Sequence, residues 1–198
     1  MIPLTVPELM RLALQSLRQP KVVMSQILRF DLTRKNLVLL TFLLIVVDLM
    51  SGLVLEILFP GMLAGGAGLR RGVAPFFVLQ MFTIFGGTLL IHSGGRLFGG
   101  VGRFDDCLKM VLWLNFVFFL LHFALPLSAV VMPHMQGMVF LVIAAISFVQ
   151  MVAYVMVVHR FERVVSVVFG VLAAQFIFGI FLLILSGMLG LNIGVEPV

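Results

Sequence analysis

Charged residues and cysteines are scarce in this sequence. Only 11% of its 198 residues are Asp, Glu, Lys or Arg, whereas soluble domains have about a quarter. Polar side chains therefore cannot cover the surface of a soluble domain, and a soluble enzyme, a disordered tail and a fibrous protein are excluded. The lone Cys107 excludes an internal disulfide and a cysteine-based metal site.

Motifs of catalysis are also lacking. There is no HExxH, GxSxG or P-loop sequence, and the four histidines (His92, His122, His134 and His159) are scattered along the chain. We therefore nominate no catalytic, metal-binding or cofactor-binding residues, and we expect a protein that is not an enzyme and needs no cofactor.

Long apolar runs fill the rest of the chain. Apolar residues make up 62% of it, and a helix that crosses a bilayer needs about 20 of them in succession. Five stretches qualify: residues 37–59, 73–98, 110–131, 137–158 and 164–191. A transmembrane barrel would instead show short alternating strands. The predicted fold is all-α, a polytopic membrane protein whose five-helix domain covers residues 37–191.

The distribution of basic residues predicts the orientation. Eleven of the 13 lie before the first span or in the loops on that same side, and only Arg70 and Arg71 lie on the other. Basic residues stay on the cytoplasmic side, so we expect a cytoplasmic N-terminus, a tail at 192–198 on the opposite side and an inner-membrane location. This bias accounts for the net charge of +5 without nucleic-acid binding, which we do not expect.

Residues 1–36 are predicted to form cytoplasmic amphipathic surface helices. Thr5 and Glu8 fit a capping box, and Pro20 should break the first helix. Three interpretations remain open for this segment: docking to a partner, binding to the anionic leaflet, and simple packing at the membrane surface.

The loop after the second span is rich in glycine. Residues 94–106 read GGRLFGGVGRFDD, and glycine lets the backbone approach a ligand closely. Arg96, Arg103, Asp105 and Asp106 are therefore candidates for binding a lipid headgroup or a partner. The alternative is a tight turn in which the two acids favour the N-terminus of the next helix.

Polar residues inside the spans suggest a second candidate site. Asp48 lies in the middle of the first span, and burying a carboxylate there is costly unless it has a partner. We expect Asp48 to point into the bundle and to bond His122 or Gln175 in a polar layer at the midplane. The proposed layer consists of Asp48, His122, Gln175, Ser147 and Asn115. Gln80 instead falls on a stripe with Gly87 and Gly94 that is typical of helix packing.

Three passages resemble one family of membrane proteins. They are Leu17-Arg18-Gln19-Pro20-Lys21, the glycine-rich loop, and Val158-His159-Arg160-Phe161. With the five spans, they make the chain similar to the bacterial members of the Yip family, the Ypt/Rab-interacting-protein type. The resemblance implies a scaffold or accessory subunit that contacts the lipid bilayer and either other membrane-protein subunits or copies of itself. The alternative function is a small transporter or a proton or ion pathway that uses the polar layer.

Overall fold

The structure is a computed structural model that describes residues 5–58, 73–123, 128 and 133–190. All regular elements in these residues are helical. In chain order they are α1 (Val6–Arg18), α2 (Pro20–Leu28), α3 (Arg34–Leu58), α5 (Val73–Leu97), α6 (Phe104–His122), the short 3-10 helix η1 (Pro133–Met135), α8 (Gln136–His159) and α9 (Val164–Met188). The all-α prediction is confirmed.

Four of these helices, α3, α5, α8 and α9, are long and apolar enough to cross a membrane. Their bounds agree with four predicted spans to within a few residues. The remaining predicted span, 110–131, corresponds to α6 in its first part, and most of its second part lies outside the described residues. The helix begins at Phe104 rather than at residue 110, because Asp105 and Asp106 are favourable in a first turn.

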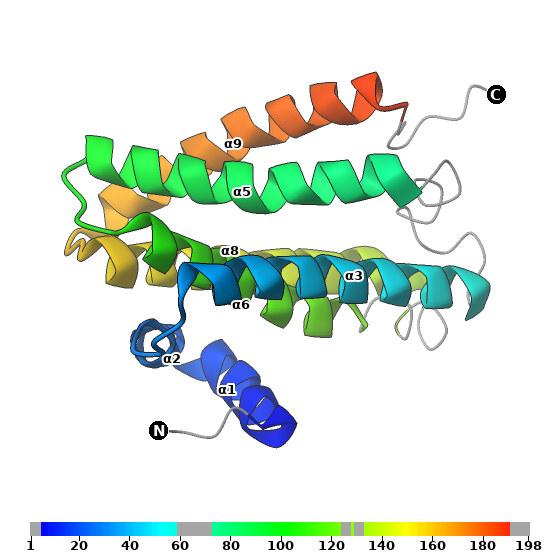
Figure 1. Cartoon of the computed structure of the whole chain (residues 1–198), viewed down its shortest axis with the longest axis horizontal. Helices are drawn as coiled ribbons and strands as arrows, with labels where there is room; N and C mark the ends of the chain where they lie inside the picture. The colour runs from blue at the N-terminus through cyan, green and yellow to red at the C-terminus, as the bar shows by residue number, and fades with distance from the viewer. Residues whose placement is uncertain (1–4, 59–72, 124–127, 129–132, 191–198) are drawn as a thin grey trace.

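The long helices run side by side along the longest axis of the molecule (Figure 1). Helix α6 packs against α3, α5 and α8, while α9 packs against α5 and α8. Cys107, Leu108 and Met110 of α6 are almost fully buried, as is Tyr154 of α8. Helix α6 therefore occupies the centre of the bundle.

One end of the bundle collects the charged side chains, and we call it the charged end. Helices α3, α6 and α9 begin there and α5 and α8 finish there, on the left in Figure 1. Arg34 Nε lies 3.1 Å from Asp105 Oδ1, which ties the starts of α3 and α6 together. Lys109 Nζ donates to the backbone oxygen of Phe30 at 3.0 Å and so fastens the segment after α2.

The N-terminal helices lie beside the bundle near its charged end (Figure 1). The break predicted at Pro20 is present, since α1 finishes at Arg18 and Pro20 opens α2. The predicted capping box is wrong. Thr5 is the N-cap residue but its side chain makes no capping hydrogen bond, and Glu8 forms an ion pair with Arg11 at 3.1 Å instead.

Candidate functional site

The glycine-rich loop between α5 and α6 folds around the side chain of His159. The loop turns back on α5 through a 2.8 Å hydrogen bond from Gly100 N to Gly95 O. Gly99 has a φ of +83°, which glycine adopts without strain. Val101 N then donates to the backbone oxygen of His159 at 3.3 Å. The last residue of α8, only 1% exposed, thus fixes the loop.

The imidazole of His159 fills space that other residues would need for a Cβ atom. A Cβ on Gly100 would lie 2.5 Å from Nδ1, one on Gly102 would lie 2.8 Å from it, and one on Gly95 would overlap the ring. All three are closer than side chains approach in folded proteins. We call Gly95, Gly100, Gly102 and the ring they enclose the histidine cradle.

Polar contacts orient the ring within the cradle. Gly102 N donates to Nδ1 at 3.3 Å, so the proton of a neutral ring resides on Nε2. Cys107 Sγ lies 3.7 Å from Nε2. The ring of Phe161 stacks on the imidazole with centroids 5.5 Å apart. The cradle thus joins the ends of α5, α6 and α8 at one side chain.

The chemistry of this cluster favours packing over reaction. Burial, aided by the nearby charge of Asp106, raises the pKa of the Cys107 thiol to about 12. The thiol is therefore neutral at physiological pH, whereas nucleophiles and metal ligands are thiolates. His92 Nδ1 is also buried, without a hydrogen-bond partner among the described residues. Within those same residues, no three His, Cys, Asp or Glu side chains are grouped to hold a metal.

The turn after the cradle is tight. Arg160 has a φ of 56° and ends α8 in the left-handed conformation. Phe161 N then donates to Met156 O at 3.0 Å, which satisfies a carbonyl at the end of the helix. This turn places Phe161 on the ring of His159 and leads directly into α9.

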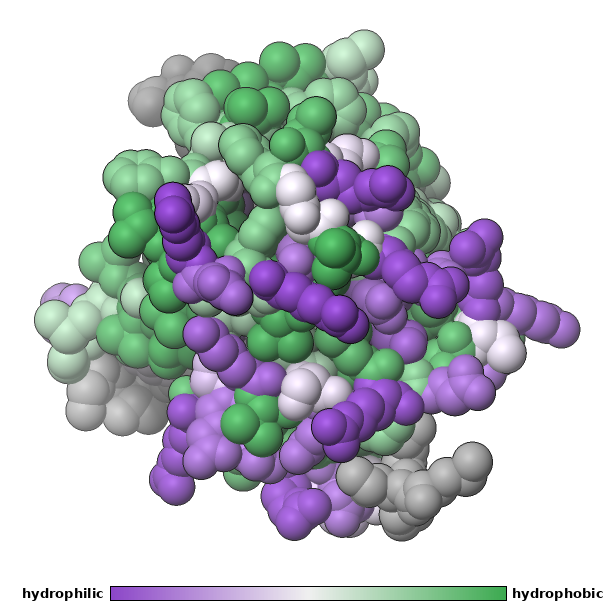
Figure 2. Space-filling model, turned by 90° about the vertical axis from the view of Figure 1, so that its left-hand side faces the viewer, coloured by the Kyte–Doolittle hydropathy of each residue, from purple (hydrophilic) through white to green (hydrophobic). Residues whose placement is uncertain are grey.

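The candidate residues of the loop divide into two groups. Asp105 binds Arg34 through two hydrogen bonds of 3.1 and 3.2 Å, and Asp106 lies 3.7 Å from Lys109. Arg96 and Arg103 are exposed. Figure 2 looks onto the charged end, where hydrophilic residues gather across the centre and the lower half. The acids thus make ion pairs within the chain, and the two arginines face outward.

Large apolar side chains accompany those arginines on the loop. Leu97 is 84% exposed, Phe98 77% and Val101 62%. Their side chains extend outward from a backbone that the cradle holds in place. We call these three residues the loop triad.

The residues of the predicted polar layer lie in different surroundings. Half-buried Asp48 accepts a hydrogen bond from Gln80 on α5. Asn115 donates to Val111 O of its own helix at 2.8 Å. Gln175 is exposed on α9, with its amide nitrogen 3.4 Å from Met151 Sδ. Ser147 is half-buried, and the side chain of His122 lies outside the description. The layer as a whole stays a prediction.

Three features of the structure were not predicted from the sequence. The sequence predicts no contact between His159 and the glycine-rich loop, although the loop folds around its side chain. The hydroxyls of Ser16 and Tyr154 hydrogen-bond to each other and attach α1 to α8. Gln150 is 2% exposed, and neither atom of its amide has a hydrogen-bond partner in the described part of the chain. The available sequence signals for the first two were a histidine just before the turn into the last span and the lone tyrosine of the chain.

The long apolar helices packed side by side define a polytopic helical membrane protein. The family model of the Yip1 domain matches residues 14–186 of this chain. The chain therefore belongs to the Yip1-domain family. No curated protein and no solved structure matches it.

Proposed function

We propose that this protein is a non-enzymatic accessory or scaffold subunit of the bacterial inner membrane. Its charged end would face the cytoplasm, because basic residues are retained there. Membership of the Yip1-domain family and the four long apolar helices support an integral membrane protein. The function itself would consist of holding another membrane-protein chain at the charged end.

The loop triad is the observation that carries this proposal. Leu97, Phe98 and Val101 are each more than 60% exposed, at an end of the molecule where hydrophilic residues gather (Figure 2). Exposed apolar groups with a polar rim are typical of protein interfaces. Because the cradle already fixes the loop, ordering it on binding would cost little. Arg96 and Arg103 would supply the rim.

Photo-crosslinking in native membranes tests this proposal. A photoreactive amino acid at Phe98 is expected to give a discrete adduct with a second protein chain, and the same probe at exposed Glu162 serves as the control. An adduct with this chain itself would indicate a homo-oligomer. The same partner should co-purify with the unaltered protein and be lost with Leu97→Ser/Val101→Ser.

Two results would contradict a protein partner at the loop triad. Adducts with lipid alone at position 98, or co-purification unaffected by the double serine variant, would overturn the proposal. Elution volume and helical circular dichroism, unchanged in that variant, would show that the loss of the partner is not a loss of fold.

A second candidate function rests on the hydrogen bond between Asp48 and Gln80. An acidic residue within an apolar span marks a proton or ion pathway in many transporters. Asp48→Asn keeps a hydrogen-bonding side chain but cannot release a proton. A proton flux in proteoliposomes that Asp48→Asn abolishes would establish this function, and no flux with the unaltered protein would reject it.

A further inference from the structure

The apolar surface of α1 is wider than its contact with the bundle. Its inner face, with Leu12, Ala13 and Ser16, is buried. A second stripe remains exposed: Val6 (72%), Met10 (41%), Leu14 (65%) and Leu17 (39%). Steps of four, four and three residues place these side chains on one face of the helix. We call them the outer stripe.

The attachment of α1 determines what surrounds the outer stripe. Ser16 bonds Tyr154, which precedes the last residue of α8 by five positions, or about 7.5 Å at the rise of an α-helix. Helix α1 is thus held against the flank of a long apolar helix rather than beyond its end, as Figure 1 shows. With the long helices crossing a bilayer, a helix at this position would lie beside the interface of one leaflet, and its outer stripe is exposed.

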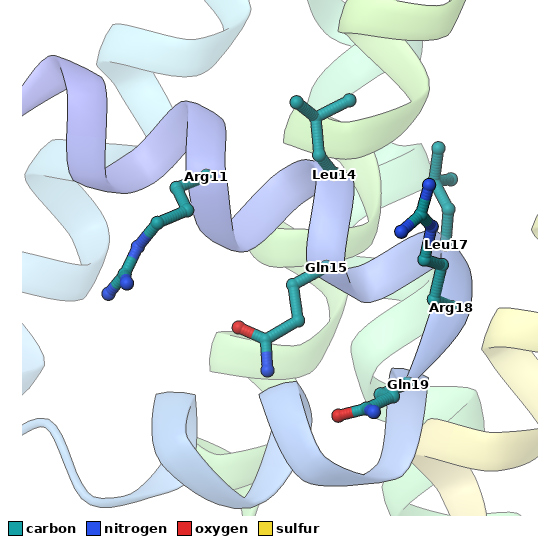
Figure 3. Close-up of a pocket in the computed structure, with 6 residues that line it drawn as sticks. All are labelled: Arg11, Leu14, Gln15, Leu17, Arg18 and Gln19. Carbon is teal, nitrogen blue, oxygen red and sulfur yellow. The ribbon is translucent and has the colours of Figure 1, made fainter.

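Basic side chains border the outer stripe. A pocket of about 570 Å³ is lined by Arg11, Leu14, Gln15, Leu17, Arg18 and Gln19. Figure 3 shows Arg11 and Arg18 on either side of Leu14, with Gln15 directed toward α2. Residues 5–28 contain three basic side chains and one acidic one, Glu8, which pairs with Arg11. An apolar stripe bordered by basic side chains complements an anionic phospholipid, because its acyl chains match the stripe and its phosphate is opposite in charge to the arginines.

We propose that the outer stripe inserts between the lipids of an anionic leaflet, with Arg11 and Arg18 contacting their phosphates. Helix α1 then contacts protein on one side and lipid on the other, so its docking to α8 depends on the lipid composition around the protein. This inference is independent of the loop triad and of the partner proposed for it.

Spin labels in the full-length protein test the inference. Leu14→Cys and Met10→Cys report on the outer stripe, and Gln19→Cys reports on an exposed polar position at the end of α1. The unsubstituted protein, with buried Cys107, is the labelling control. Each variant is reconstituted in vesicles of phosphatidylcholine alone or mixed with phosphatidylglycerol, and collisions with oxygen and with a water-soluble nickel complex are compared.

The expected result is that labels at positions 10 and 14 collide mainly with oxygen in the anionic vesicles, and that the label at position 19 collides mainly with nickel. Each of Arg11→Gln and Arg18→Gln should reduce the inserted population about fivefold. Equal insertion in both vesicle types would overturn the anionic preference. Preferential collision with nickel at position 14, or shielding from both reagents by a protein, would overturn the membrane contact.

Discussion

In the histidine cradle, one imidazole ring packs directly against the backbone of three glycines. The ring of His159 is held because three residues near it have no side chain. Gly94 precedes the cradle in the same helix, but a Cβ there would meet nothing within 4 Å. The two adjacent glycines therefore differ in environment while sharing a helical backbone, and they provide a matched pair of sites.

Gly95→Ala should destabilise the protein, and Gly94→Ala should not. The new methyl group at position 95 overlaps the imidazole, and overpacking of this kind costs about 1–3 kcal/mol. We expect a fall of several degrees in Tm, at about 2–4 °C per kcal/mol. Gly94→Ala should leave Tm unchanged or raise it, because alanine favours a helix. Equal Tm values for the two variants would contradict the cradle.

Cys107 should be unreactive in the folded protein. Its pKa of about 12 keeps the thiol neutral where an unfolded cysteine, with a pKa of about 8.5, ionises. The difference stabilises the fold fully below about pH 8.5, and that contribution declines as pH rises toward 12. Maleimide labelling at pH 8 should be slow in the folded protein and fast after denaturation. Equal rates in both states would refute the burial of Cys107.

At the scale of elements, the packing of α1 and α2 shows how an amphipathic segment can be attached to a membrane bundle. Ser16 and Tyr154 join α1 to α8, while Lys109 holds the chain just after α2 through the backbone oxygen of Phe30. Val23 and Met24 of α2 are fully buried. The two helices are therefore part of the folded core at the charged end.

Removing either hydroxyl of the first contact should loosen α1. Ser16→Ala or Tyr154→Phe leaves the other hydroxyl buried without this partner, at a cost of about 1–3 kcal/mol, and the double variant should cost less than the sum of the single ones. Ser25→Ala is the control, because Ser25 bonds only Val22 O of its own helix in the described contacts. Hydrogen exchange in α1 measures the effect. Unchanged exchange in Tyr154→Phe would argue against the contact.

The helices were predictable from sequence, but their partners were not. Long apolar runs set the bounds of α3, α5, α8 and α9 because each run is a continuous local signal. The hydrogen bond between Asp48 and Gln80 instead joins residues 32 positions apart. Depth along a span can be counted from sequence, but the rotation of a helix about its axis depends on its neighbours. The surroundings of His159 were unpredictable for the same reason, since Gly102 and Cys107 are more than 50 positions away in the sequence.

At the scale of the whole molecule, basic side chains gather at the charged end. Arg34, Arg96, Arg103 and Arg163 all lie at helix termini of this end. The uneven distribution of basic residues in the sequence therefore corresponds to one end of the fold. We expect this end to face the cytoplasm, because basic residues are retained there.

Reporter fusions measure directly which side of the membrane the charged end faces. A reporter that is active only in the cytoplasm should work when fused after residue 33 or 103 and should fail after Val198. We expect this outcome because basic residues are retained on the cytoplasmic side and the number of predicted spans is odd. Cytoplasmic activity of the fusion after Val198 would contradict the five-span arrangement.

The last two turns of α8 also set the order in which the chain can assemble. Tyr154 and His159 complete contacts with Ser16 and Gly102, which precede them by 138 and 57 positions. A ribosome delivers the earlier segments first. During synthesis, α1 and the glycine-rich loop therefore lack these contacts until α8 has been made. A factor that bound the nascent protein before α8 is complete would therefore meet both segments without these contacts.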